Sequence, residues 1–304
     1  MKVLLTGVSG YVGSRLLPRL QSAGHDVRGF VRRPRELGIP MITGDAVTGQ
    51  GLDEALDGVD VAYFLIHSME HSSDGPFEVR ERTAAENFAG AARGAGVERI
   101  VYLGGLLPAG GPASVHLSSR FEVESILREA SPCTISYRAS IVIGANSRSF
   151  RFLVRLVERL PVLAVPAWGP NRTAPIDERD MVELLVGAGT GEVGQLCGQS
   201  LDIGGPDVVS YAELIDRIRH HMFVSRPTLK LSRLTVTPIA SRIGAAIAGE
   251  DPDLIGPLME SLGDDLIPRD RHAADVLGVR LHSLDAAIER SLREWEAIEP
   301  LAAR

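Results

Sequence analysis

The chain is poor in features that mark several classes of protein. Its 304 residues include only two cysteines, Cys133 and Cys197, so we predict neither a disulfide framework nor a cysteine-based metal site. No apolar run reaches the ~18 residues of a membrane-spanning helix. The net charge is −7, and no basic cluster indicates nucleic-acid binding. The sequence opens on a strand rather than a secretory signal, so we expect a soluble, cytoplasmic protein.

The chain does have enough apolar material for a large core. It is 44% hydrophobic and 23% charged, as globular proteins are. Short apolar runs alternate with helix-length segments, which predicts an α/β fold with a doubly wound, parallel sheet of the Rossmann type. We expect a Rossmann core over residues 1–148. Residues 149–304 would form a smaller substrate or lid lobe that packs on the core and shares its late strands.

The strongest motif lies near the start of the chain. An apolar strand is followed by Gly7, Gly10 and Gly13, then by a helix over about 11–23 and a second strand over 26–31. The glycines would permit a tight turn, a close approach to a pyrophosphate and close helix–sheet packing. Free N–H groups at the helix start would bind the phosphates. The motif predicts a dinucleotide site; the alternative is an ordinary glycine-rich turn. The expected contacts are Thr6, Gly7, Ser9, Gly10, Tyr11, Val12 and Gly13.

Two arginines follow the second strand. An acidic residue at this position would bind the ribose hydroxyls of NAD, but the chain has Arg32 and Arg33. Guanidinium groups match a phosphate in charge and geometry. We therefore predict NADPH as the cofactor, with NADH as the alternative. The alternative for the two arginines is a solvated charge pair at the end of a strand.

The remaining site residues are expected at the carboxyl ends of the strands, where open α/β sheets bind ligands. Further cofactor contacts are predicted at Asp45, Ala46, Ile66, His67, Gly104 and Arg120. The substrate is expected against Ser68, Met69, Gly105 and Leu106, and against the lobe residues Phe150, Trp168, Met222 and Met259. The alternative for each of these lobe residues is that it belongs to the hydrophobic core.

These motifs carry a family resemblance. Residues 6–13, Thr-Gly-x-x-Gly-x-x-Gly, resemble the extended and atypical short-chain dehydrogenase/reductases. Other segments resemble the atypical subgroup related to NmrA and to the complex I accessory subunit. They are residues 64–69, 86–88, 116–124, 168–170 and 201–206. The resemblance covers most of the chain and implies a Rossmann fold with a nicotinamide cofactor.

The sequence departs from this family at its catalytic residues. The family implies a serine and a Tyr-x-x-x-Lys pair, in which the tyrosine is the acid and the lysine holds the ribose. The matching positions here are His116 and Arg120, and the serine position falls among Gly104, Gly105 and Leu106. His116 could donate a proton, or lie on the helix surface or against the cofactor. Arg120 could hold the ribose, but its pKa is too high for proton transfer.

The resemblance leaves three interpretations open. Tyrosine-less relatives include ketoreductases of antibiotic biosynthesis that act on aromatic polyketides such as angucyclinones. This implies an NADPH-dependent ketoreductase of an aromatic ketone or quinone, with a proton from His116, water or the substrate itself. NmrA-like relatives imply instead a non-catalytic NADP(H) sensor with a protein partner, and complex I relatives imply a structural subunit. The adjacent His220 and His221 would point apart on a helix, so we expect no metal site.

Overall fold

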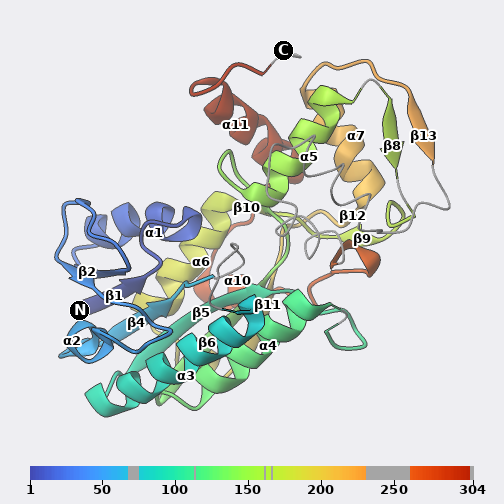
Figure 1. The fold of residues 1–304 in the computed structure, drawn as a ribbon. Helices are drawn as coiled ribbons and strands as arrows, with labels where there is room; N and C mark the ends of the chain where they lie inside the picture. The colour runs from blue at the N-terminus through green and yellow to red at the C-terminus, as the bar shows by residue number, and fades with distance from the viewer. Residues whose placement is uncertain (68–74, 113, 161, 166, 231–260, 302–304) are drawn as a thin grey trace.

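The computed structural model describes residues 1–304 except 68–74, 113, 161, 166, 231–260 and 302–304 (Figure 1). Its centre is a seven-stranded sheet in which every pairing is parallel. This confirms the Rossmann-type α/β prediction. In sheet order the strands are β11 (Ser200–Ile203), β6 (Cys133–Ala139), β5 (Arg99–Gly105), β4 (Val61–Phe64), β1 (Lys2–Thr6), β2 (Asp26–Val31) and β3 (Met41–Thr43).

Helices cover both faces of the sheet (Figure 1). The apolar positions of the long central helix recur at helical spacing, at Phe77, Ala84, Phe88 and Ala92, and the last three pack on one face of the sheet. The helices on that face are α2 (Leu52–Leu56), α3 (Phe77–Ala95) and α4 (Val115–Arg128). The opposite face carries α1 (Tyr11–Ser22), α6 (Glu178–Thr190) and α10 (His272–Leu277).

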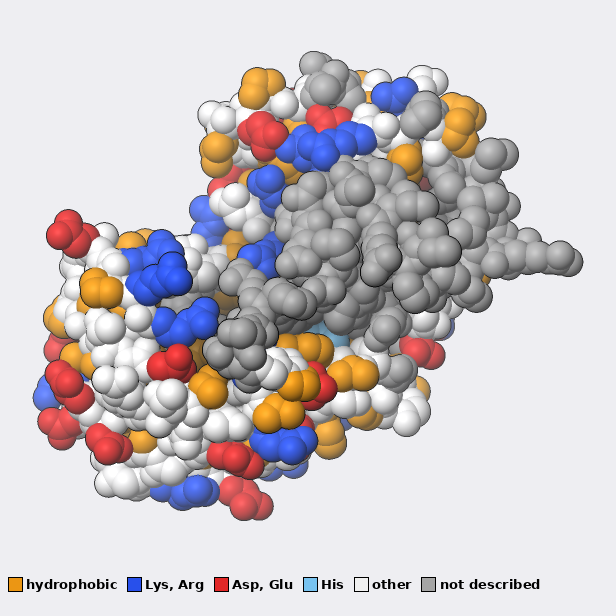
Figure 2. Space-filling model, viewed as in Figure 1, with side chains coloured by type: hydrophobic (Ala, Val, Ile, Leu, Met, Phe, Trp, Pro, Cys, Tyr) orange, Lys and Arg blue, Asp and Glu red, His pale blue; other side chains and the backbone are white. Residues whose placement is uncertain are grey.

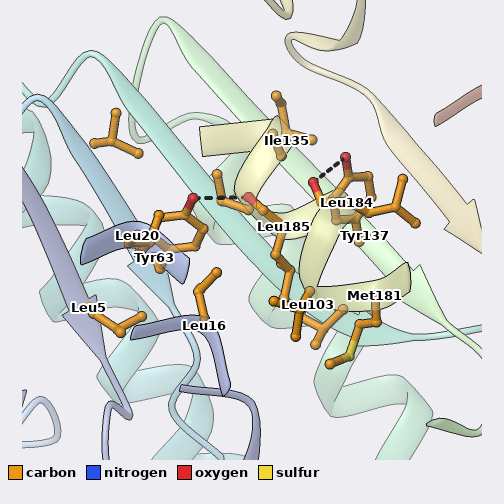
Figure 3. Close-up of a cluster of buried hydrophobic side chains, with 14 of the residues drawn as sticks. Leu5, Leu16, Leu20, Tyr63, Leu103, Ile135, Tyr137, Met181, Leu184 and Leu185 are labelled. Atoms are coloured by element: carbon orange, nitrogen blue, oxygen red, sulfur yellow. Dashed lines mark hydrogen bonds between the residues drawn. The ribbon is translucent and has the colours of Figure 1, made fainter. Parts of the chain in front are cut away.

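Two buried tyrosines fix α6 against the sheet. The hydroxyl group of Tyr63 donates to the carbonyl oxygen of Leu185 at 2.9 Å, and that of Tyr137 to Leu184 at 3.2 Å (Figure 3). Leucine side chains from β1, α1 and β5 fill the space around them. A buried hydroxyl needs a partner, so these bonds set the height at which α6 crosses the strands.

A second hydrophobic core lies in the C-terminal lobe. Phe150, Trp168, Met222 and Trp295 are buried together there. Its helices are α5 (Arg148–Arg159), α7 (Tyr211–His221) and α11 (Leu284–Glu296), and the 3-10 turn η2 (Ser261–Gly263) adds Leu262. The other 3-10 turn, η1 (Gly194–Leu196), adds Leu196 to the core of the large sheet. Three two-stranded pairs accompany them: β7 (Val142–Ile143) with β10 (Ile176–Asp177), β9 (Arg172–Thr173) with β12 (Val209–Ser210), and β8 (Leu163–Val165) with β13 (Thr228–Lys230).

The core also uses elements from the second half of the chain. Helix α6, strand β11 and helix α10 complete the layers around the large sheet. The layers around the large sheet therefore include residues on both sides of position 148. The assignment of separate roles to residues 1–148 and 149–304 stays a prediction. No helix in the described part of the chain is long and apolar enough to cross a membrane.

A network of charged side chains joins the core to the lobe. Arg15 of α1 lies 3.2 Å from Glu178 of α6 and also pairs with Glu294 of α11. Arg290 of α11 reaches Asp177 at 3.3 Å. Asp177 and Glu178 are buried, so unpairing either carboxylate would be costly. These ion pairs hold the last helix against α1 and the start of α6.

The two cysteines form a disulfide bond, which the sequence analysis did not predict. Cys133 is the first residue of β6, and Cys197 lies shortly before β11, the strand paired with β6. Their Cα atoms are 4.6 Å apart, although the residues are separated by 64 positions in the sequence. The prediction was wrong because sequence spacing does not show which strands become neighbours in the sheet.

Candidate functional site

The glycine turn has the geometry that the motif predicts. Gly7 has φ +65°, and a Cβ atom there would lie 2.6 Å from the carbonyl oxygen of Leu65. A Cβ atom at Gly13 would lie 2.3 Å from the carbonyl oxygen of Gly7. Helix α1 begins after Gly10 with no side-chain cap and no acidic residue in its first turn. Its first N–H groups are therefore available to an anion, and the turn fits a pyrophosphate.

Neighbouring residues of the turn support its shape. The hydroxyl group of Thr6 donates to the carbonyl oxygen of Tyr63 at 2.9 Å and accepts from the N–H of Leu65 at 3.0 Å. Its side chain thus joins β1 to β4 instead of facing a ligand. Ser9 is exposed and Val12 packs against the core. Burial and the charge of Glu178 raise the pKa of Tyr11, so its hydroxyl group stays protonated.

The predicted adenosine end of the site lies beyond β2 and β3. Arg32 and Arg33 are exposed, and within the described residues neither makes a hydrogen bond or an ion pair. Figure 2 shows Lys and Arg side chains gathered over the part of the molecule that carries α1 and β2. Asp45 accepts the N–H of Val47 at 2.8 Å. Its carboxylate therefore shapes the loop after β3.

The loop after β3 is also held from α3. The side-chain amide of Asn87 donates to the carbonyl oxygens of Ala46 and Val47, at 3.0 and 2.9 Å. Ala46 is buried. Asn87 is thus a supporting residue of the predicted cofactor site that the sequence analysis did not assign. Its position, three residues after Ala84 of the apolar stripe, was the available signal.

A buried polar cluster lies beside the tip of β4. Nδ1 of His67 is 2.6 Å from Oε1 of Glu81, which comes from α3. The other carboxylate oxygen of Glu81 accepts the hydroxyl group of Ser119 of α4, also at 2.6 Å. Glu81 and Ser119 are each 2% exposed, whereas the side chain of His67 is 40% exposed. The cluster thus runs from the protein interior to a partly accessible histidine.

Arg120 is the fourth member of this cluster. Its guanidinium donates to the carbonyl oxygen of Leu103, and Nη1 lies 3.3 Å from Nδ1 of His67 and 3.7 Å from Oε1 of Glu81. Its Cζ atom lies 5.1 Å from the ring centre of Tyr102. These contacts hold the buried guanidinium in the wall of the site, so its positive charge acts on His67 and Glu81.

His116 lies one helical turn before Arg120. Its ring centre is 5.4 Å from that of His67, so the structure brings the two histidines together. Within the described residues the buried Nδ1 atom of His116 has no hydrogen-bond partner. Burial, followed by the charges of His67 and Arg120, lowers the pKa of His116 to about 3. His116 is therefore a neutral imidazole near pH 7.

The charges of the cluster are unequal. Burial alone would raise the pKa of Glu81, but the hydrogen bond from His67, the charge of Arg120 and the hydrogen bond from Ser119 hold it well below its usual range. Glu81 is therefore a carboxylate. Burial and the charge of Arg120 lower the pKa of His67, while Glu81 opposes that change. His67 thus has an anionic partner, which His116 lacks.

Some of the remaining predicted site residues lie at the strand tips, and others are buried in the core of the lobe. Gly104 and Gly105 end β5, next to Leu106, which is buried against Leu117. Ile66 is half-buried against the core. Phe150, Trp168 and Met222 are no more than 5% exposed and pack in the core of the lobe, as the alternative interpretation has it. Ser68, Met69 and Met259 lie outside the described residues.

Glu81 and Ser119, like Asn87, are site residues that the sequence analysis did not assign. Glu81 lies four residues after Phe77 and three before Ala84, which places it on the apolar stripe of α3. A carboxylate on such a stripe must have a buried partner. That signal was available in the sequence, but it did not identify His67 as the partner.

Comparison with known proteins agrees with this geometry. Residues 7–131 match the protein-family model described as NAD(P)H-binding. The chain is similar to that family over 125 of its 304 residues. Together with the fold, this similarity supports the suspected relation to the short-chain dehydrogenase/reductases.

Three curated relatives carry enzyme names. A ceramide reductase of Caulobacter vibrioides is 28% identical over 60% of this chain and 59% of its own length. A 3 beta-hydroxysteroid dehydrogenase/Delta 5-->4-isomerase of Mycobacterium tuberculosis is 32% identical over 40% of this chain and 38% of its own. The (4-alkanoyl-5-oxo-2,5-dihydrofuran-3-yl)methyl phosphate reductase of Streptomyces griseus is 28% identical over 69% of this chain and 70% of its own. The first two alignments thus cover less than two thirds of the relatives.

Solved structures extend the likeness to nearly the whole chain. MoeE5, in complex with UDP-glucose and NAD, has a TM-score of 0.72 at 20% identity and covers 98% of this chain and 99% of its own. The UDP-glucuronic acid 4-epimerase of Bacillus cereus, in complex with NAD, has a TM-score of 0.74 at 15% identity, covering 98% of this chain and 100% of its own. At these identities the likeness shows the fold.

Proposed function

We propose that the protein is an NADPH-dependent ketoreductase that works without the Ser-Tyr-Lys triad. The observation that carries this proposal is the uncapped glycine turn beside the tip of β4, where His67 meets Glu81 of α3 and Arg120 of α4. A bound nicotinamide would supply a hydride there. The protein would orient the carbonyl group and stabilise its oxygen, and the names of the relatives as reductases favour that chemistry.

We propose a carbonyl group of an aromatic polyketide, of the angucyclinone type, or of a quinone as the substrate. This choice rests on the resemblance to tyrosine-less ketoreductases. The curated relatives suggest a second group of compounds for the same assay, since one is named as a ceramide reductase and another as a 2-alkyl-3-oxoalkanoate reductase of Shewanella oneidensis. His116, neutral at pH 7, would donate a hydrogen bond to the substrate or cofactor rather than a proton.

A non-catalytic NADP(H) sensor is the second candidate. It is favoured by the contacts of Arg120, whose guanidinium donates to the carbonyl oxygen of Leu103 and lies 3.7 Å from Glu81, which leaves fewer of its N–H groups for a ribose. A sensor would bind the dinucleotide through the same glycine turn, and a protein partner would be expected.

One assay separates the two candidates. NADPH absorbance would be followed with purified protein and a panel of polycyclic aromatic ketones, quinones, 3-oxoalkanoates and 3-oxosteroids, with NADH in parallel. Consumption of NADPH with an equal amount of alcohol product supports the reductase, and the best compound defines its class. Tight binding of NADPH without consumption of any compound contradicts the reductase and favours the sensor.

The choice of cofactor has its own test. Replacing Arg32 or Arg33 by alanine should weaken NADPH binding by about tenfold, equivalent to about 1.4 kcal/mol, and leave NADH binding unchanged. The exposed Arg93→Ala variant, on α3, is the control. If both the Arg32→Ala and the Arg33→Ala variant bind NADPH as tightly as the unsubstituted protein does, the proposed phosphate contact is contradicted.

A further inference from the structure

The acid of a tyrosine-less reductase must reach the carbonyl oxygen and must be able to carry a proton. His67 and His116 are the two histidines of the candidate site. Their surroundings differ in whether a carboxylate is hydrogen-bonded to the imidazole ring. His67 has a carboxylate partner at 2.6 Å, and within the described residues the buried Nδ1 atom of His116 has none. A carboxylate stabilises the imidazolium form and fixes which nitrogen carries the hydrogen.

We propose that His67 is the proton donor of the reaction, that Glu81 positions its imidazole ring, and that Ser119 positions Glu81. This inference rests on the proposed reductase function. Because Nδ1 of His67 faces Glu81, Nε2 is the nitrogen left for the substrate. Within the described residues no hydrogen bond engages Nε2, and the side chain is 40% exposed.

The location of His67 agrees with this role. It follows β4, which lies next to β1 in the sheet, and β1 leads into the glycine turn. Leu65, two residues before His67, donates its N–H to the hydroxyl group of Thr6. Its carbonyl oxygen lies so close to Gly7 that a Cβ atom there would be 2.6 Å away. The histidine is therefore built onto the same strand tip that closes one side of the predicted dinucleotide site.

A bound nicotinamide would supply the hydride, and His67 would supply the proton. The carbonyl carbon gains the hydride, the electrons of the C=O double bond move to the oxygen, and the oxygen takes the proton from Nε2–H of His67. The products are the alcohol, the oxidised cofactor and neutral His67, which regains a proton from water. Glu81 stays ionised throughout, because its pKa is held well below the usual range.

The charges that face His67 determine the expected pH dependence. They are Glu81 of α3, His116 and Arg120 of α4, and Arg148 of α5. Burial and the two arginines lower the pKa of His67 from 6.5, and Glu81 raises it. Only a minority of His67 is then protonated at pH 7, so kcat/KM should increase as the pH falls towards that pKa.

Substitution separates the catalytic role from a structural one. His67→Gln should lower kcat by between about 10²-fold and 10⁴-fold, the usual range for a general acid, and change the dissociation constant for NADPH by less than about threefold. His67→Gly should regain part of this rate when imidazole is added to the assay. His220→Gln, which replaces an exposed histidine of α7, is the matched control and should keep the activity. A His67→Gln rate close to that of the unsubstituted protein overturns the inference.

The positioning role of Glu81 has a readout that needs no turnover. In the cofactor-free protein labelled with 15N-histidine, NMR should show His67 protonated at Nδ1 in its neutral form. Glu81→Gln should lower the pKa of His67 and move the pH profile of kcat/KM the same way, and Ser119→Ala should do so less. An unchanged His67 titration in Glu81→Gln contradicts the positioning role. Lack of turnover by the unsubstituted protein on the whole panel defeats the reductase itself.

Discussion

The hydroxyl oxygen of Tyr63 occupies the space into which a side chain at Gly189 would extend. A Cβ atom at Gly189 would lie 1.8 Å from that oxygen and 2.5 Å from Cζ of the ring. Tyr63 is fully buried in β4, and its hydroxyl group is bonded to Leu185 of the same helix as Gly189. The glycine therefore sets how closely α6 approaches the sheet.

Replacement of Gly189 by alanine should destabilise the protein. The tyrosine cannot move without losing its hydrogen bond, and overpacking of this kind costs about 1–3 kcal/mol. Gly90→Ala, in the middle of α3 with no atom near the new Cβ, should instead stabilise by about 0.5–1 kcal/mol. Urea unfolding of the two variants measures both effects. Adding Tyr63→Phe to Gly189→Ala should relieve part of the loss, and equal stability of the two glycine variants would contradict the contact.

The sheet and its helices were largely predictable because the physics that forms them is local. Strands buried on both faces require unbroken apolar runs, as in residues 61–64. Serine is a favoured residue at the start of a helix, and Ser210 and Ser283 each accept an N–H group of the first turn, at 3.1 and 3.4 Å. Non-local pairing is harder to read: the sequence pattern alone does not show that β6 ends at Ala139 and that Val142 pairs with β10.

The site was less predictable because it depends on contacts between distant residues. The glycine turn is a local motif, so its shape was foreseen. The pairing of His67 with Glu81 joins a strand tip to a helix 14 residues later, and Ser119 adds a third element. The sequence around each of these residues does not show which residue it contacts. The role of Trp168 was undetermined for the same reason, because an aromatic residue suits a core and a pocket equally.

Replacement of Gly13 by alanine should reduce cofactor binding. The new Cβ atom would lie 2.3 Å from the carbonyl oxygen of Gly7, so α1 would have to move away from the turn that its N–H groups complete. We expect at least a tenfold weaker affinity for NADPH, about 1.4 kcal/mol, by fluorescence titration. Gly94→Ala, a helical glycine with nothing near its new Cβ, should leave the affinity unchanged. Unaltered NADPH binding by Gly13→Ala would exclude this turn as the pyrophosphate site.

Loss of the disulfide between Cys133 and Cys197 should lower stability without affecting the site. Closing a loop across 64 positions is worth about 4 kcal/mol in the chain-entropy model. The bond lies where β6 begins, and the glycine turn and His67 lie beyond the other ends of their strands. A Cys133→Ser, Cys197→Ser double variant should unfold at lower urea concentration and bind NADPH normally. Two free thiols in the unfolded, unreduced protein would show that the bond does not form.

Acid should destabilise the protein partly through His116. The unfolded chain protonates this residue near its ordinary pKa of 6.5, whereas burial and the charges of His67 and Arg120 lower its pKa in the folded state to about 3. Between these values unfolding takes up a proton, so the free energy of unfolding falls as the pH is lowered below about 6.5, by at most about 1.4 kcal/mol per pH unit from this group. Urea unfolding of His116→Gln between pH 7.5 and 5 should give a shallower decline. If this variant and the unsubstituted protein lose stability in parallel, His116 is not held neutral by its surroundings.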